Sequence, residues 1–205
     1  MRRLVLTSLF AFGLATCLAL PSAAAAQHLK LDIRVFIGLG ETTYVALLET
    51  GREREFLGSY QVGFGPRLRW GKASFEALFS FNRWLYEGVN PSLGGNETQV
   101  NSFEFPLLAG YIPYTNPYFR WFIYGGFVNH FNTKIIVRRD GESSLRLKPK
   151  ADNLAIYQAL ARLGTSVDLA MFNFDINYSI SMNSATTTSY RTSYHQLQLN
   201  LSYLF

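Results

Sequence analysis

Cysteine is almost absent from this chain, and long apolar stretches are absent from all but its beginning. The single cysteine, Cys17, lies in the N-terminal segment, so the rest of the chain holds no disulfide framework, cysteine metal ligand or cysteine nucleophile. After residue 26 no apolar run approaches the ~20 residues that a spanning helix needs. If a membrane holds this part of the chain, strands must cross it.

A strong excess of one charge is also lacking. The chain carries 19 basic and 14 acidic residues, a net charge of +5. This mild excess indicates no acidic partner in particular, and we do not expect a nucleic acid as a partner.

Residues 1–26 have the layout of a secretory signal peptide. Arg2 and Arg3 precede an apolar stretch from Leu4 to Leu20, and a run of alanines from Ala23 to Ala26 follows. A retained membrane anchor is the alternative, but the stretch is at the short edge of a spanning helix. We expect removal of residues 1–26 and an exported domain of residues 27–205.

Aromatic residues are abundant, at 16%, and they follow a period of two that is typical of strands. In the last segment one face carries Leu197, Leu199, Leu201, Tyr203 and Phe205, and the other is mostly polar. The same alternation recurs in seven earlier segments. The eight segments are residues 31–37, 59–70, 74–82, 102–111, 119–127, 157–167, 172–182 and 196–205.

The apolar faces are crowded with Phe, Tyr and Trp near strand ends, as expected for aromatic girdles at two bilayer interfaces. Short connections (71–72, 112–117 and 168–170) alternate with long ones (41–56, 87–98, 131–153 and 184–190). Outer-membrane barrels have short periplasmic turns and longer outer loops. The sequence therefore predicts an all-β protein, an eight-stranded antiparallel up-and-down transmembrane β-barrel integral to a bacterial outer membrane.

Three motifs carry a resemblance to a known family. They are Asn101–Tyr111 with its Glu-x-Pro-Leu core, Asn116-Pro117-Tyr118 leading to Tyr124-Gly125-Gly126, and the alternating run Phe172–Ser179. Over residues 28–205 the chain resembles the PorT-like outer-membrane β-barrel family of Bacteroidetes-type bacteria. The resemblance implies the same barrel, and the name-giving member serves a protein-secretion and gliding apparatus. The last strand resembles the C-terminal signal that the outer-membrane assembly machinery recognises.

Charged residues recur on the faces predicted to point inward. Besides Asp32 and Arg34, they are Arg67, Arg69, Glu76, Glu104, Arg120, Arg162 and Asp175. Buried charges need partners, and we expect Glu76 to pair with Arg67 or Arg69. The other expected pairs are Glu104 with Arg120 and Arg162 with Asp175. A barrel of this size has room for side chains or one small ligand, so we predict an ion-pair plug, with a polar conduit or ligand site as the alternative.

The segment Ser193-Tyr194-His195 is the one candidate for an enzymatic site that the sequence offers, because a lipid A deacylase needs a serine, a histidine and an orienting carboxylate. Glu87 or Glu97 could supply the carboxylate. We interpret the segment as an interfacial polar pair, and His130 as another interfacial side chain. No metal-ligand spacing or phosphate loop occurs, so no cofactor is expected.

The segment 131–153 is predicted to be a solvated hairpin with Asp140-Gly141 as its turn and arms at 135–137 and 145–147. The alternative is a basic surface for lipopolysaccharide or a protein partner. Our leading hypothesis is a non-enzymatic barrel that acts as a structural or interaction module through its outer loops. A lipid-modifying enzyme and an accessory subunit of a secretion or uptake complex are the alternatives.

Overall fold

The computed structural model describes residues 29–48, 51–85, 97–138, 144–187 and 192–205. The predicted signal peptide lies outside these residues and stays a prediction. The strands are β1 (Leu29–Leu48), β2 (Gly51–Trp70), β3 (Ala73–Ala77), β4 (Phe79–Leu85), β5 (Glu97–Thr115), β6 (Phe119–Arg138), β7 (Leu145–Leu147), β8 (Tyr157–Leu169), β9 (Phe172–Ser181) and β10 (Thr192–Leu204). A short 3-10 helix, η3 (Pro149–Asp152), follows β7.

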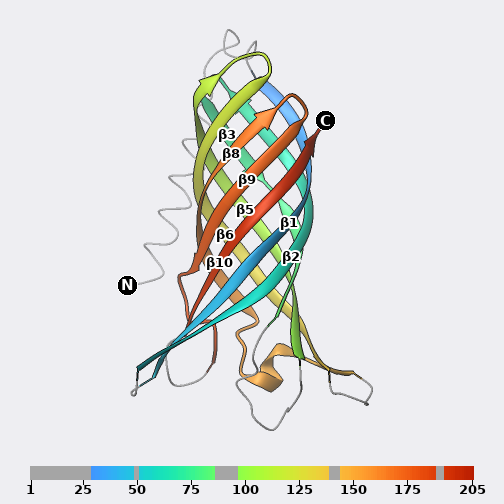
Figure 1. The fold of residues 1–205 in the computed structure, drawn as a ribbon, viewed down its shortest axis with the longest axis vertical. Coiled ribbons are helices and arrows are strands. Elements are labelled where there is room, and N and C mark those ends of the chain that lie inside the picture. The colour runs from blue at the N-terminus through green and yellow to red at the C-terminus, as the bar shows by residue number, and fades with distance from the viewer. Residues whose placement is uncertain (1–28, 49–50, 86–96, 139–143, 188–191) are drawn as a thin grey trace, which may run out of the picture.

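Antiparallel pairing closes these strands into one ring of eight. The ring runs β1, β2, β3 with β4, β5, β6, β8, β9 and β10, and β1 pairs with β10 to close it (Figure 1). β3 and β4 form one strand interrupted at Leu78, opposite Pro106, which has no N–H to donate to the ladder. The predicted eight-stranded antiparallel barrel is confirmed.

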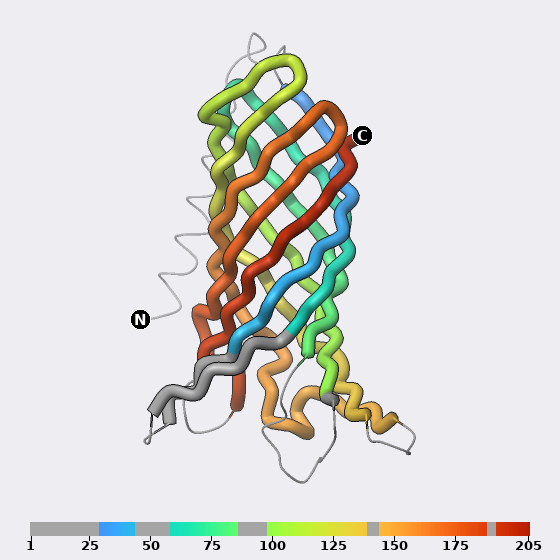
Figure 2. Tube along the Cα trace, in the orientation of Figure 1, coloured from blue at the N-terminus to red at the C-terminus, as the bar shows by residue number. Residues whose placement is uncertain are grey.

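The strands are tilted because their registers are staggered around the ring. If one starts at Thr42 of β1 and moves from each residue to its register partner on the next strand, one full turn around the barrel ends at Asp32 of β1, ten residues earlier in the chain. The path passes through Thr42, Gln196, Ser179, Arg162, Gly126, Leu108, Glu76, Arg67 and Asp32. A stagger of this size over eight strands corresponds to a tilt of about 40°, and Figure 2 shows the inclined strands.

Alternate side chains point to the lumen and to the exterior, and the apolar ones point outward. Leu39 is 70% exposed and Leu199 is 59% exposed, whereas Gln196 and Gln198 are buried. A water-soluble protein shows the opposite arrangement, so this exterior suits a bilayer. Exposed aromatic side chains ring the barrel near both ends: Trp70, Tyr111, Trp121, Phe172 and Tyr203 at one, and Tyr60, Phe103, Phe131, Tyr157 and Tyr178 at the other.

Three short connections in the described part of the chain, residues 71–72, 116–118 and 170–171, lie at the same end of the barrel as Phe205. In Figure 1 this end is at the top, and η3 lies at the bottom. The loop predicted at 41–56 was too long, because β1 continues to Leu48 and β2 begins at Gly51. No helix among the described residues is long and apolar enough to cross a membrane.

The predicted hairpin arms beyond the barrel are present. Ile135, Ile136 and Val137 of β6 pair with Leu147, Arg146 and Leu145 of β7. The turn predicted at Asp140-Gly141 lies outside the described residues. After β7, η3 brings the chain back over the open end of the barrel, where Pro149, Asp152 and Leu154 are buried. Sequence reasoning did not anticipate this return.

Candidate functional site

The first group of interest is a set of ion pairs inside the barrel, near the end with the short turns. Arg34 and Arg67 both bind Glu76, at 3.0 and 2.7 Å. Arg67 also binds Asp168 at 2.9 Å, and Arg120 reaches the same carboxylate at 3.1 Å. The network therefore links side chains of β1, β2, β3, β6 and β8 across the lumen.

Aromatic and polar side chains fill the space around these ion pairs. The Arg67 guanidinium lies 4.6 Å from the centre of the Phe122 ring. Tyr124 donates a hydrogen bond to Asp175, whose other oxygen accepts bonds from Asn177 and Asn200. Each buried carboxylate is thus neutralised and hydrogen-bonded, as buried charges require.

A second buried cluster lies farther toward the end with the long connections. Glu104 binds Arg162 at 2.9 Å and His130 Nδ1 at 3.0 Å, and Asn82 donates to it at 3.0 Å. His130 Nε2 lies 2.9 Å from Asn132 Oδ1. Sequence reasoning placed His130 at a membrane interface, and this was wrong: its side chain is fully buried in the lumen.

Two predicted pairings were also wrong. Glu104 lies in register with His130, whereas Arg120 lies in register with Asp168. Arg162 lies opposite Ser179, which is four residues from Asp175 in the chain. The arginine that forms a salt bridge with Asp175 is Arg34, at 3.7 Å. The cause is the stagger of the barrel, which decides the height of each side chain. Arg69, the other partner considered for Glu76, binds Asp32 at 2.6 Å.

An apolar plug closes the lumen at the end with the long connections. Its buried members are Trp84, Val100, Val128, Ile135, Val137, Leu154, Leu160, Ala185 and Tyr194. The Trp84 and Tyr194 rings are 5.4 Å apart, and Tyr194 lies equally close to the His130 ring. Leu154 and Ala185 come from the connections, so these segments are packed into the barrel mouth.

The Ser193-Tyr194-His195 segment lies on β10, with Ser193 and His195 on the outer surface. His195 is bound to the Tyr178 hydroxyl. Glu97, one carboxylate considered as its partner, is on β5, which lies across the ring from β10, so that assignment was wrong. Glu87 lies outside the described residues. Glu41 of the neighbouring strand β1 also faces outward, and its register partner is Leu197, two residues from His195.

The residues predicted to form the assembly signal lie on the outer surface of β10 and just beyond it. Leu197, Leu199, Leu201, Tyr203 and Phe205 are all exposed. Phe205 exchanges backbone hydrogen bonds with Ile33 of β1, at 3.0 and 3.2 Å. The terminal residue therefore contributes to the seam where the barrel closes.

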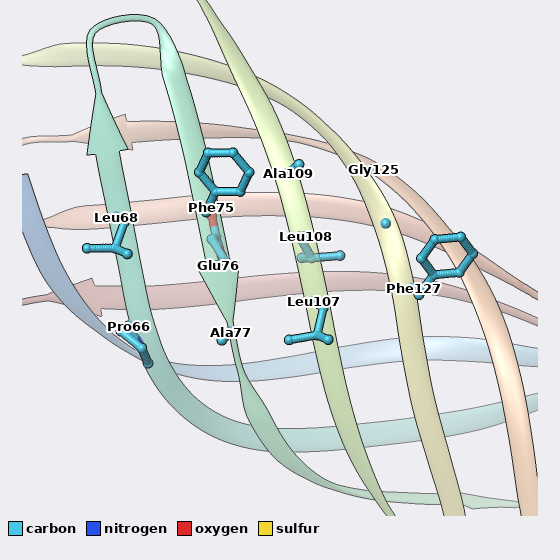
Figure 3. Close-up of a pocket in the computed structure, with 11 residues that line it drawn as sticks. Pro66, Leu68, Phe75, Glu76, Ala77, Leu107, Leu108, Ala109, Gly125 and Phe127 are labelled. Atoms are coloured by element: carbon cyan, nitrogen blue, oxygen red, sulfur yellow. The ribbon is translucent and has the colours of Figure 1, made fainter. Parts of the chain in front are cut away.

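An apolar recess of about 510 Å³ lies on the outer surface over β2, β3, β5 and β6. Figure 3 shows Phe75 and Phe127 at its sides and Ala109 and Gly125 between them. Glu76 also borders it, but its carboxylate is bound by Arg34 and Arg67. The recess offers an apolar surface and no free catalytic group.

No group of three or more His, Cys, Asp or Glu side chains among the described residues is placed to hold a metal ion. The buried carboxylates Glu76, Asp168 and Glu104 are each bound by an arginine.

No family model matches the chain, and no curated protein sequence matches it. Solved structures do match, at low sequence identity. The outer membrane enzyme PagL is 13% identical, with a TM-score of 0.51, over 83% of this chain and 98% of that one. Neisserial surface protein A is 13% identical, with a TM-score of 0.49, over 84% and 97%.

The attachment invasion locus protein Ail of Yersinia pestis is 12% identical, with a TM-score of 0.47, over 86% of this chain and 99% of that one. These structures are outer-membrane β-barrels of eight strands, some enzymatic and some not. At 13% identity and a TM-score of 0.51, the likeness to PagL shows the fold and does not assign a role.

Proposed function

We propose that this chain is an integral protein of a bacterial outer membrane that catalyses no reaction and conducts no solute. In this proposal residues 1–26 direct export, and the barrel acts as a structural or interaction module through its long connections. The apolar exterior and the similarity to outer-membrane barrels support the location. The resemblance to the PorT-like family is part of the proposal.

The filled lumen is the observation that carries this function. One end is occupied by the ion pairs around Glu76 and Asp168, and the other by the plug around Trp84 and Tyr194. An ion or solute would have to displace both layers in series. The barrel is therefore better suited to display surfaces than to transport.

A conductance measurement tests the closed lumen. The protein should migrate differently on gels with and without heating, and should show no stepwise conductance in a planar lipid bilayer. Trp84→Ala should also show no stepwise conductance, because the ion-pair layer still blocks the other end of the lumen. Stepwise conductance of the wild-type protein, or its recovery as a soluble periplasmic protein without detergent, would contradict the proposal.

Surface labelling tests the orientation. Single cysteines at Gly71, in a short turn, and at Arg146, in the outer hairpin, can be introduced with Cys17→Ser. We expect a membrane-impermeant maleimide to label Arg146→Cys on intact cells and Gly71→Cys after lysis alone. The opposite pattern would invert the orientation.

The interaction partner is proposed to bind at the long-connection end. A subunit role in a secretion or uptake complex belongs here, and co-purification in mild detergent would test it. Deletion of residues 139–143 should release such a partner, and barrel folding is the control. Recovery of the same partner after deletion would locate the contact elsewhere.

A lipid-modifying enzyme is the second candidate, because Ser193 and His195 share the outer surface and Glu41 is two residues from Thr43, the register partner of His195. Mass spectrometry of lipid A from cells with and without the protein would separate the candidates. Loss of an acyl chain that His195→Ala and Ser193→Ala both abolish would establish the enzyme. Unchanged lipid A would remove it.

A further inference from the structure

A row of four outward-facing residues, which begins at Tyr60 of the aromatic girdle, lies in register at the long-connection end. Tyr60 of β2 lies opposite Arg83 of β4, Arg83 lies opposite Asn101 of β5, and Asn101 lies opposite Lys134 of β6. The row therefore crosses four adjacent strands of the ring at the boundary between the apolar band and the connections.

Arg83 is held in this row by aromatic rings and one amide. Its guanidinium carbon lies 5.7 Å from the centre of the Tyr60 ring and 5.9 Å from that of Phe81. Its Nε donates to Asn101 Oδ1 at 2.8 Å. No carboxylate in the described part of the chain pairs with it, so its terminal nitrogens are left to bind an external acceptor.

Two further cations lie on the same surface, on β6 and β7. Lys134 is half-buried and, within the described ranges, makes no ion pair. Arg146 of β7 lies opposite Ile136, two residues beyond Lys134, and is exposed. The matching surface over β1 and β10 instead carries Glu41, Ser193 and His195, and none of these three described side chains is a lysine or an arginine.

An aromatic cluster lies directly next to this row, within the apolar band. The Phe79 ring is 5.6 Å from Phe103 and 5.1 Å from Phe105, and Phe81 is 5.7 Å from Phe103. These rings provide a rigid apolar surface beside three cations. This is the layout that a lipid requires, with an anionic head above apolar chains.

We propose that Arg83, Asn101 and Lys134, with Arg146 beyond them, bind the phosphate of an outer-leaflet glycolipid whose acyl chains lie against the cluster of phenylalanines. Guanidinium groups bind phosphate through two parallel N–H donors, and an ammonium group adds a point charge. The height of the row, where the apolar band ends, matches the position of a lipid headgroup. The assignment to the outer leaflet rests on the proposed orientation.

The test uses the purified full-length barrel in detergent, titrated with diphosphorylated lipid A and followed by native mass spectrometry. Dephosphorylated lipid A and phosphatidylcholine are the comparison lipids, and inorganic phosphate is added as a competitor. We expect one preferred diphosphorylated lipid per barrel. Each cation near a lipid surface accounts for about fivefold in binding, so Arg83→Gln with Lys134→Gln should weaken it roughly thirtyfold.

Lys72→Gln is the matched control, because Lys72 also lies over an aromatic ring, that of Tyr111 at 5.9 Å, but at the opposite end. It should bind lipid A like the wild type, and Arg83→Lys should bind with intermediate strength. Equal binding by the double variant, or equal binding of dephosphorylated lipid A, would overturn the site. Full displacement by equimolar inorganic phosphate would show a free-anion site and overturn it as well.

The outcome is separable from that of the proposed function. Lipid binding in detergent does not depend on which end faces outward, whereas maleimide labelling on cells does. Selective binding with inverted labelling would overturn the assignment to the outer leaflet, but the same residues would still form the lipid-binding site. Correct labelling without selective binding would overturn this inference alone.

Discussion

Glu76 shows how a single buried charge is made tolerable in this barrel. Its carboxylate is nearly inaccessible and is held by two arginines from different strands, Arg34 and Arg67. Removing one partner of a buried ion pair leaves the other charge without compensation, which costs far more than the pair contributes. The side chain therefore matters for stability although it takes part in no reaction.

Glu76→Gln should lower the free energy of unfolding by about 3 kcal/mol, the lower end of the usual cost, because Arg67 and Arg34 each lose one carboxylate but keep Asp168 and Asp175. The measurement is urea unfolding of the barrel in lipid vesicles, followed by tryptophan fluorescence and by gel mobility. Glu41→Gln is the control: the same chemical change at an exposed position should cost at most about 1 kcal/mol. Equal effects of the two substitutions would show that the inner network contributes nothing particular.

The period-two pattern identified most of the charged residues that face inward, but it predicted the partners of few of them; the contact of Glu76 with Arg67 is one that it did predict. Period-two alternation assigns Glu104 and Arg162 to the lumen from each strand alone, without knowledge of how the strands are paired. Their contact at 2.9 Å depends on the ten-residue stagger, which no local pattern encodes. Asp168 is the penultimate residue of β8, inside the short connection 168–170 that the sequence predicts, so the alternation does not assign it to the lumen.

At the level of elements, β2 and β3 approach closely because of a glycine. A Cβ atom at Gly65 would lie 2.3 Å from the Ala77 carbonyl oxygen and 2.8 Å from the Leu78 Cα, both backbone atoms. Backbone cannot rotate away as a side chain can, so the two strands would have to separate. At Gly58, on the same strand, a Cβ would meet only the Leu85 side chain, at 4.0 Å.

Gly65→Ala should therefore destabilise the barrel by about 1–3 kcal/mol, the usual cost of overpacking. Gly58→Ala should change stability by no more than about 0.5 kcal/mol, as is common for open surface sites. Unfolding midpoints of the two variants in the same detergent would show the difference. A loss at Gly58 as large as that at Gly65 would mean that strand flexibility, and not close approach, is what these glycines provide.

Strand ends were harder to predict than strand identity. The alternation is clear where one face meets lipid and the other the lumen, as in β9 and β10. Beyond the bilayer both faces of a strand can meet water, so apolar and polar side chains no longer need to alternate. The continuation of β1 to Leu48 and of β6 to Arg138 therefore left no periodic signal, although the β6–β7 arms were visible from their β-branched residues.

At the scale of the whole molecule, the barrel is complete only when β10 pairs with β1. Thirteen register pairs join the two strands, from Arg34–Leu204 to Ala46–Thr192. This seam brings together residues that are far apart in the chain, so it must form late relative to the local hairpins. The C-terminal residues contribute to the seam and also remain accessible on the exterior.

Phe205 tests whether those residues are recognised during assembly or merely stabilise the product. Its side chain is 72% exposed and contacts the Tyr203 ring at 4.7 Å, while its hydrogen bonds to Ile33 use only the backbone. Phe205→Ser should therefore leave the unfolding free energy of the refolded barrel within about 1 kcal/mol of the wild type, yet strongly reduce the amount inserted in cells. Phe205→Tyr, which keeps the ring, should insert normally. Quantifying the heat-modifiable form in the outer-membrane fraction, beside refolding in vitro, separates the two effects, because parallel losses in both would mean that the ring acts through stability and not through recognition.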